Sequence, residues 1–352
     1  MASVYRVRSA EGQRAPYGTL RPEEAAQLIE ERMTLARQNL SKIESQRLAE
    51  DGKVIAVTHN GKFHADEVMA TAVLKKVYAN RGQSLEVVRS RDLVTIASAD
   101  IVYDVGGVYD HERRRYDHHQ PGALKRENGL TRSALGLIWL HYGLEYCEGN
   151  ERAAAKIDNV LVRGIDARDN GELKAPEDPE ARNFGISEDI ELYNPIIEQG
   201  ETYDDQFVKA VGYAAERLAR LYDKVLVEIR TEDAIAAARA ESGDERYAVM
   251  DHQVVPPDIL STWDGFEYLV FPEYTNNTWQ IYAMRTPEDP FVSKRPFPKA
   301  WAGLMNDELA KMTGVDDALF CHVKRFLTVA KTREGALALL SQALEQSERR
   351  DS

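Results

Sequence analysis

The sequence has few cysteines, no long apolar run and no signal-peptide core, and each of these absences excludes some classes of protein. It holds two cysteines, Cys147 and Cys321, with no CxxC pair, which is typical of reduced, buried thiols in a cytosolic protein. No run approaches the ~20 uninterrupted apolar residues of a spanning helix, which excludes a membrane span. The N-terminus has no apolar signal-peptide core, and Pro16 and Gly18 interrupt its faintly transit-like pattern, so we expect a cytoplasmic protein.

The chain also lacks an excess of positive charge. Its formal net charge of −13 argues against a protein that coats nucleic acid through a broad basic surface. This charge does not exclude a nuclease, because a carboxylate-rich metal site itself adds negative charge. Short basic clusters, such as the three arginines at 113–115, can still guide a phosphate backbone.

The composition that is present indicates a globular protein of two domains. Apolar residues make up 43% and charged residues 29% of the 352 residues. We predict an N-terminal helical extension (1–50, with a helix over 20–49) and a metal-binding catalytic domain (51–203). A linker helix (204–243) and a C-terminal substrate-binding domain (244–352) follow.

Apolar periodicity predicts an α/β fold for the catalytic domain. Short β-branched runs at 54–57, 85–88 and 101–105 are typical of buried parallel strands. They alternate with helical patterns at 66–78, 133–142 and 151–164, which favours an open, mainly parallel sheet with helices on both faces. The apolar pattern of the C-terminal segment (244–352) predicts a smaller α+β domain, joined to the catalytic domain by the long helix. Its strands are expected near 247–250, 268–271, 279–284 and 319–323, and its helices over 301–312 and 335–345.

Histidines and aspartates are concentrated in one part of the chain. Five of the eight histidines lie between positions 59 and 119, and several aspartates are interleaved with them: His59, His64, His111, His118 and His119, with Asp66, Asp104, Asp110 and Asp117 among the aspartates. Imidazole suits Mn, Fe, Co or Zn, and carboxylates also accept Mg. This mixture of residues predicts a site for divalent metal ions.

The positions of three of these side chains favour a common site. His59 follows the run 54–57, Asp104 ends the run 101–103, and Asp166 follows an expected helix-to-strand junction at 160–165. Ligand sites in an open parallel sheet form beyond the carboxyl ends of its strands, so we expect the three to meet at one edge. A lone surface histidine usually has no function, and we interpret His111, His141 and His252 in that way.

Four motifs in this region carry a family resemblance. They are Thr58–Glu67 (THNGKFHADE), Tyr103–Asp110 (YDVGGVYD), Tyr116–Gln120 (YDHHQ) and Asp166–Gly171 (DARDNG). Together they resemble the motifs of the melanocyte-proliferating-gene family of exonucleases, a branch of the DHH phosphoesterases. Looser similarities follow at Phe291, Arg295, Pro298, 301–304 and 320–322, so the resemblance extends from about residue 54 to the end.

The resemblance implies a two-metal centre. His59 and His64 would bind one ion, Asp66, His118 and Asp166 the other, and Asp104 would bridge them. His119 would face the substrate phosphate, and Asp117 would orient its neighbours. With a histidine at position 64, where many DHH enzymes have an acid, Mn, Co or Zn is favoured over Mg. Two such ions would activate a water for in-line displacement at phosphorus.

The resemblance also implies that the C-terminal domain binds the rest of the substrate, with the active site in the interdomain cleft. The candidate phosphate contacts are Arg295, His322, Lys324 and Lys331. The family's Gly-Phe-Ile-Gly-Gly stretch is Arg-Phe-Leu-Thr-Val at 325–329 in this chain. Glycines let a backbone approach a phosphate closely, so their replacement changes that contact; Lys331 with Thr332 is a candidate substitute.

Three functions follow from these residues. The first is hydrolysis of phosphodiester bonds in RNA or short oligonucleotides, exonucleolytic and dependent on two divalent ions such as Mn. The second is a small-molecule phosphoesterase or pyrophosphatase of the same superfamily, which the acidic net charge and the lost glycines favour. The third is a metal-stabilised binding protein without catalysis.

Overall fold

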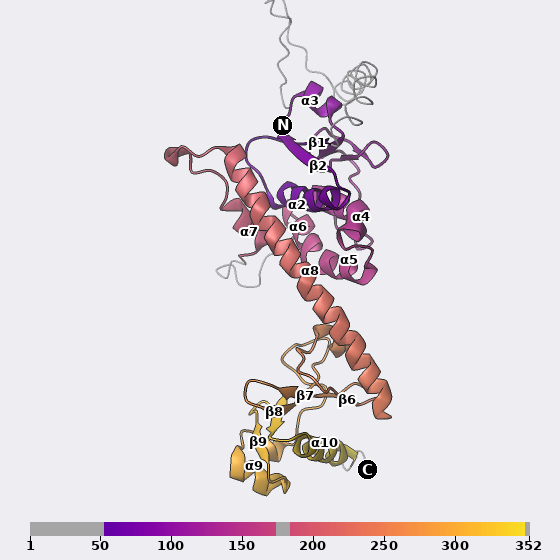
Figure 1. Ribbon diagram of the computed structural model, residues 1–352, viewed down its shortest axis with the longest axis vertical. Coiled ribbons are helices and arrows are strands. Elements are labelled where there is room, and N and C mark those ends of the chain that lie inside the picture. Colours follow the sequence, from indigo (N-terminus) through magenta and orange to yellow (C-terminus); the bar gives the residue numbers. More distant parts are fainter. Residues whose placement is uncertain (1–52, 174–183, 349–352) are drawn as a thin grey trace, which may run out of the picture. The chain divides into compact units, whose positions relative to one another are not determined.

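The computed structural model describes residues 53–173 and 184–348, and its chain divides into two compact units (Figure 1). The first unit ends at Tyr222 and the second begins at Asp223, a boundary inside helix α8 (Tyr203–Ser242). The helix predicted over 20–49 lies outside the described residues. Among those described, no helix is long and apolar enough to cross a membrane.

The first unit contains a five-stranded sheet in the order β2-β1-β3-β5-β4. Its strands are β1 (Lys53–Thr58), β2 (Ser84–Arg89), β3 (Ile101–Tyr103), β4 (Tyr109–Asp110) and β5 (Arg115–Tyr116). Strands β2, β1, β3 and β5 are parallel to one another. Strand β4 pairs antiparallel with β5 at the edge of the sheet. The predicted open, mainly parallel α/β sheet is confirmed.

Helices cover both faces of this sheet (Figure 1). On one face, Ile96 of α3 (Leu93–Ser98) packs with Val57 and Val102 of the strands. On the other side, α2 (Ala65–Asn80) packs against β2 and against α4 (Ala134–Tyr146). Most of α2 is buried, which fixes the start of this helix beside the end of β1.

The expected helix-to-strand junction near Ile165 is wrong. The chain stays helical through α5 (Glu151–Ile157), a π-helical turn (Asp158–Val162) and α6 (Arg163–Asp169). Ile157, Val162 and Ile165 are buried while Val160 is exposed, so the apolar run is one face of a helix with an extra residue in its turn. Asp166 is therefore a helical residue and does not follow a strand.

The start of α8 completes the first unit. Its buried residues recur at helical spacing (Phe207, Ala210, Val211, Ala214, Leu218 and Tyr222). The Phe207 ring meets the fully buried ring of Phe63 edge-on, with centroids 5.5 Å apart. Asn194, between α7 (Ile186–Glu191) and a 3₁₀ turn (Ile197–Gln199), also holds Phe63: it accepts from the backbone N–H at 3.1 Å and donates to the carbonyl at 2.9 Å. These contacts fix the loop from His59 to His64.

The second unit has its own sheet, in the order β6-β7-β8-β10-β9. The strands are β6 (Tyr247–Val249), β7 (Tyr268–Glu273), β8 (Thr278–Ala283), β9 (Ala318–Cys321) and β10 (Leu327–Ala330). Only β6 and β7 are parallel. Helix α10 (Arg333–Glu348) packs on one face, and Ile235 of α8 joins the core on the other.

Two details of this α+β unit differ from the prediction. The helix expected over 301–312 is a short 3₁₀ turn (Lys299–Trp301) followed by α9 (Asn306–Thr313), because Gly303, with φ +78°, separates them. Strand β10 was not predicted. A further 3₁₀ turn spans Asp258–Thr262.

Candidate metal centre

The side chain of His59 lies at the carboxyl end of β1, as the motif predicts. Its Nε2 is 3.0 Å from Glu67 Oε1 and 3.1 Å from Asp104 Oδ2. Its Nδ1 is 3.2 Å from the carbonyl oxygen of Asn60, which assigns the proton to Nδ1 in the neutral ring. The ring is buried and presents Nε2 to two carboxylates.

The start of α2 brings a histidine and two acids to the same place. His64 precedes the helix, and the Glu67 carboxylate accepts its backbone N–H at 2.9 Å, which caps the helix. Asp66 is 1% exposed; its Oδ2 accepts the Ala134 N–H at 3.3 Å, and its Oδ1 has no hydrogen-bond partner. An unpaired carboxylate oxygen that is fully buried is costly unless a cation binds it.

Asp104 lies between two histidines. Its Oδ2 faces His59, and its Oδ1 is 3.2 Å from Nε2 of His118. The backbone of Asp104 has φ +55°, a left-handed conformation that aspartate tolerates better than most residues. Such local strain at a strand end is typical of functional sites.

The segment after β5 supplies His118 and His119. Both oxygens of Asp117 are occupied: Oδ2 accepts from Gly107 N at 2.5 Å, and Oδ1 pairs with His119 Nδ1 at 2.7 Å and accepts from His118 N at 2.8 Å. Asp117 thus orients its neighbours. His118 is buried among carboxylates, whereas the side chain of His119 is 63% exposed.

The structure places Asp166 in a contact other than the expected one. Arg126 donates to its Oδ2 through Nε at 2.8 Å, and Ser133 donates to its Oδ1 through the backbone N–H at 3.0 Å and the hydroxyl at 2.8 Å. The negative charge of the Asp166 carboxylate is therefore already paired with the guanidinium of Arg126. The acid of this motif that reaches the cluster is Asp169, whose Oδ2 is 3.3 Å from His118 Nε2.

The potential ligand atoms form overlapping groups within 4.8 Å of one another. The groups are His59, His64 and Glu67; His64, Asp66 and Asp169; Asp66, Glu67 and Asp104; and Asp104, His118 and His119. Asp169 and Glu67 were not predicted as ligands. Asp169 could have been weighed against Asp166, since both belong to the fourth motif; Glu67, which also caps α2, carried no separate signal.

Repulsion and burial control protonation in this cluster. Burial raises the pKa of Asp66 well above its usual range, and the charges of Asp104 and Asp169 raise it further. For Asp104, burial opposes the charge, but hydrogen bonds from His118 and His59 lower the pKa to about 2. Burial likewise opposes the charge on His59, yet its bonds to Asp104 and Glu67 raise the pKa to about 10. The cluster stabilises positive charge strongly.

These residues fit divalent metal ions. Among the described residues, no lysine or arginine forms an ion pair with Asp66, Glu67 or Asp104, although all three are buried. Three buried carboxylates so close together need compensating positive charge. Imidazole nitrogens and carboxylate oxygens are the ligands that Mn, Co and Zn prefer.

The four predicted phosphate contacts lie in the second unit. Arg295 is paired with Glu267 at 2.6 Å and donates to the Leu344 carbonyl, so its guanidinium is engaged within the fold. His322 accepts the Lys324 N–H and packs against Phe326, with ring centroids 4.4 Å apart. Lys324 and Lys331 are exposed.

The altered glycine stretch keeps one backbone feature of a glycine. Arg325 has φ +60°, the left-handed conformation that glycine favours. Leu327 begins β10, and the buried Thr328 donates to the Phe320 carbonyl at 2.8 Å. The bulky residues therefore belong to a paired strand.

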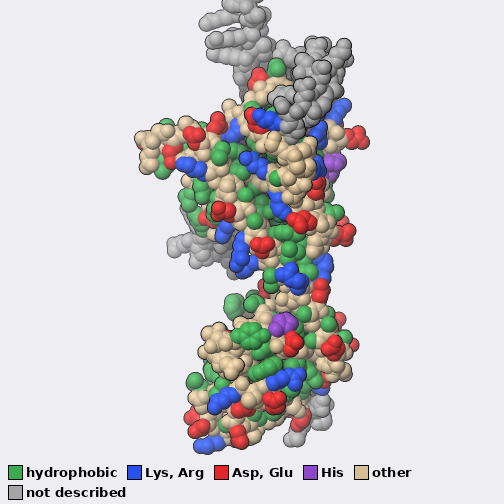
Figure 2. Space-filling model, in the orientation of Figure 1, with side chains coloured by type: hydrophobic (Ala, Val, Ile, Leu, Met, Phe, Trp, Pro, Cys, Tyr) green, Lys and Arg blue, Asp and Glu red, His purple; other side chains and the backbone are tan. Residues whose placement is uncertain are grey.

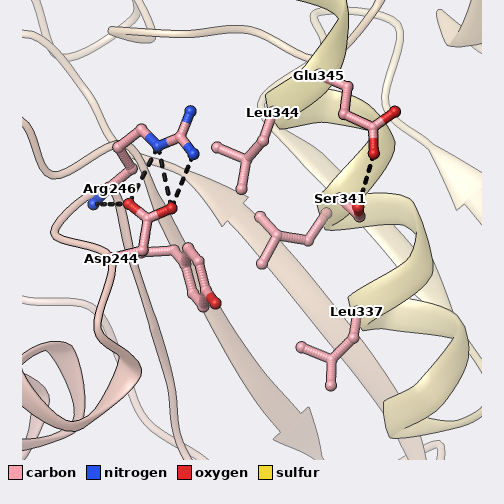
Figure 3. A pocket seen from close by; sticks show the side chains of 8 residues that line it. Asp244, Arg246, Leu337, Ser341, Leu344 and Glu345 are labelled. Carbon is pink, nitrogen blue, oxygen red and sulfur yellow. Dashed lines mark hydrogen bonds and ion pairs between the residues drawn. The ribbon is translucent and has the colours of Figure 1, made fainter.

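A hollow in the second unit does not coincide with these candidates. It is lined by Asp244, Arg246, Tyr247 and one face of α10. Asp244 and Arg246 form an ion pair with each other at 2.8 Å (Figure 3). Nothing in its lining resembles the cluster of the first unit.

Comparisons with known proteins agree with the motifs. A family model for the MYG1 exonucleases, described as "Uncharacterised protein family (UPF0160)", matches residues 55–344. The "MYG1 protein C27H6.8" of Caenorhabditis elegans is 31% identical over 328 residues, which covers 83% of this chain and 95% of the relative. The "MYG1 protein" of Chlamydia trachomatis serovar D is 32% identical over 302 residues, 82% of this chain and 96% of the relative. The human "MYG1 exonuclease" is 28% identical over 334 residues, 82% and 85% of the two chains.

A solved structure of the exonuclease RecJ bound to manganese also matches. The sequences are 14% identical, the match covers 90% of this chain and 94% of that one, and the TM-score is 0.25. A score of this size does not establish a shared overall arrangement.

The class follows from the family and the motifs: the chain is a hydrolase of phosphate esters, a nuclease or phosphoesterase. It belongs to the MYG1 exonuclease family.

Proposed function

We propose that the chain is a metal-dependent exonuclease that hydrolyses phosphodiester bonds in RNA or short oligonucleotides. The observation that carries the proposal is the set of buried carboxylates of Asp66, Glu67 and Asp104, within 4.8 Å of one another and bordered by histidines. A set of buried acids with which no described lysine or arginine forms an ion pair, at the carboxyl end of a parallel sheet, favours cation-dependent chemistry on a phosphate.

Asp104 would take part in holding both ions. Its two oxygens face different histidines, His59 and His118. His59, His64 and Glu67, whose ligand atoms lie within 4.8 Å of one another, would hold the first ion. His118 would hold the second together with Asp66 and Asp169, whose Oδ2 atoms are 3.8 Å and 3.3 Å from its Nε2. A pair of divalent ions would lower the pKa of a water and stabilise charge on the attacking and leaving oxygens.

His119 is the residue we assign to the substrate phosphate. The hydrogen bond with Asp117 raises the pKa of His119, which increases the fraction of imidazolium near neutral pH. Because Nδ1 is held by Asp117, Nε2 of this exposed ring is left to donate to a phosphate oxygen.

An aromatic and basic cluster in the second unit supports a single-stranded substrate. The Arg285 guanidinium lies 4.4 Å from the centre of the Phe326 ring, and His322 packs on the same ring. Aromatic rings beside cationic side chains are suited to stacking with bases of single strands. Phosphate recognition alone would not need these rings.

The test is Mn²⁺-dependent release of mononucleotides from a labelled RNA strand by the full chain. EDTA should abolish the release, and restoring Mn²⁺ should recover it. The absence of release with Mn²⁺, Mg²⁺, Co²⁺ and Zn²⁺, by protein shown to bind metal, would refute the proposal.

The second candidate is a small-molecule phosphoesterase or pyrophosphatase. The net charge of −13 and the replacement of the glycine stretch at 325–329 favour it. Acidic and basic side chains are also interspersed on the face drawn in Figure 2, without a broad basic area. A panel of nucleotides, cyclic dinucleotides, pyrophosphate and short RNA decides: turnover of the small substrates alone would select this candidate.

A further inference from the structure

Asn170 occupies a fixed position beside the candidate metal centre. It caps the C-terminus of α6 directly after Asp169, and Gly171 leaves the helix with φ +66°. Its Nδ2 donates to the Thr131 carbonyl at 3.1 Å and to the Asp166 carbonyl at 2.9 Å. A carboxamide has two N–H donors, and both are used on groups that can only accept. The amide therefore has one orientation.

The orientation of the Asn170 amide determines which of its atoms lies beside the His118 ring. Oδ1 of Asn170 is 3.3 Å from Nδ1 of His118. Since Oδ1 can only accept, Nδ1 of His118 must carry the hydrogen. The other ring nitrogen, Nε2, lies 3.2 Å from Asp104 Oδ1 and 3.3 Å from Asp169 Oδ2.

We propose that Asn170 is a positioning residue that holds His118 in its Nδ1–H tautomer and so presents the Nε2 lone pair to a divalent cation. This inference rests on the metal centre of the proposed function. A histidine ligand generally donates its other N–H to a second group, which fixes the ring and increases its basicity. For His59 the second group is the carbonyl of Asn60. For His118 it is a side chain, which can be replaced.

Two variants of Asn170 distinguish the role of its Oδ1, which accepts from His118, from the role of its Nδ2, which holds the side chain in place. Asn170→Asp and Asn170→Leu both remove the two Nδ2 donors, so both lose the bonds to Thr131 and Asp166. Only Asn170→Asp keeps an oxygen acceptor for His118. The two should lower the melting temperature by similar amounts, whereas their effects on His118 should differ.

The measurements use the full chain labelled with ¹⁵N-histidine. The Zn²⁺-loaded protein reports which nitrogen of His118 carries hydrogen, with its signals assigned by their loss in His118→Gln. Wild type and Asn170→Asp should show hydrogen on Nδ1. Electron paramagnetic resonance of free Mn²⁺ should show roughly 10–100-fold weaker binding by Asn170→Leu, and binding within a few-fold of wild type by Asn170→Asp.

Asn150→Ala is the matched control. Asn150 caps α5 by accepting the Ala153 N–H at 3.0 Å. Its loss should lower the melting temperature and leave Mn²⁺ affinity unchanged.

Three results would overturn the inference: hydrogen on Nε2 of His118 in the wild type, unchanged Mn²⁺ affinity in Asn170→Leu, or equal loss in both Asn170 variants. A wild type that binds no divalent ion would overturn it together with the proposed function. A wild type that binds Mn²⁺ with the expected tautomer but does not cleave RNA would refute the proposed activity and support this inference.

Discussion

At the scale of single residues, two aspartates of one motif have opposite surroundings. Asp166 is paired with Arg126, while Asp169 reaches His118. We expect Asp169→Asn to weaken Mn²⁺ binding by roughly tenfold or more, because it removes a candidate ligand. Asp166→Asn should cost about 2–3 kcal/mol of unfolding free energy, less than a fully broken buried pair because Asp158 still pairs with Arg126.

Isothermal titration with Mn²⁺ and urea unfolding measure these two effects separately. The reverse pattern, with metal affinity lost in Asp166→Asn and retained in Asp169→Asn, would support Asp166, the residue predicted from the sequence, as the ligand.

His119 tests catalysis at the same scale. His119→Ala should reduce turnover of RNA by about 10²–10⁴-fold if the imidazolium assists phosphate transfer. Because the side chain is 63% exposed, the unfolding free energy should change by less than about 1 kcal/mol. His252→Ala, at an exposed position in the second unit, is the control. A stability loss without any activity to lose would favour a non-catalytic metal-binding protein.

At the scale of elements, helix α4 depends on a glycine. A Cβ at Gly136 would lie 2.6 Å from Oδ2 and 2.8 Å from Cγ of Asp166, a carboxylate held by Arg126 and Ser133. Gly136→Ala should therefore destabilise the protein by about 1–3 kcal/mol in urea unfolding. Gly212→Ala, in open space within α8, should instead stabilise it by about 0.5–1 kcal/mol. Equal effects of the two substitutions would contradict the role assigned to Gly136.

The elements also show how far the sequence predicts the site. The ends of β1 and β3 were predictable because short β-branched runs stop at His59 and Asp104. The choice between Asp166 and Asp169 was not predictable. Both lie on one helical turn, and only the packing of α6 decides which side chain turns toward His118 and which toward Arg126. The same holds for Asn170 and Asn194, whose contacts depend on segments distant in the sequence.

At the scale of the whole molecule, a histidine outside the metal centre contributes to the pH dependence of stability. His141 bonds to the Tyr109 hydroxyl at 2.8 Å, and its ring stacks on His111 with centroids 3.6 Å apart. Burial, with the charges of His111 and Arg132, lowers the pKa of His141 to about 4 from 6.5.

The unfolded chain therefore binds the proton more readily than the folded protein. Its contribution to stability is complete above pH 6.5 and is lost as the pH falls toward 4. Unfolding of His141→Gln, measured between pH 4 and 8, should show a weaker loss on the acid side than wild type. An identical pH profile would contradict this assignment.

The net charge of the molecule determines how its substrate binding should respond to salt. With a charge of −13, the protein can bind a single strand only through a few local cations, of which Lys324 and Lys331 are exposed candidates. Each phosphate contact contributes a slope of about −0.7 to the logarithm of affinity against the logarithm of salt concentration, so two or three contacts predict roughly −1.5 to −2.

Fluorescence anisotropy of labelled RNA with the His119→Ala protein measures this slope without cleavage. Lys324→Gln should make it shallower by about 0.7, and Lys299→Gln, at a different exposed lysine of the second unit, should leave it unchanged. A slope near −5 or steeper in the His119→Ala protein would mean that a broad basic surface binds the strand, which an acidic chain with interspersed charges cannot easily provide. No measurable RNA binding, together with turnover of small phosphorylated substrates, would instead make the small-molecule phosphoesterase the better description of the same metal centre.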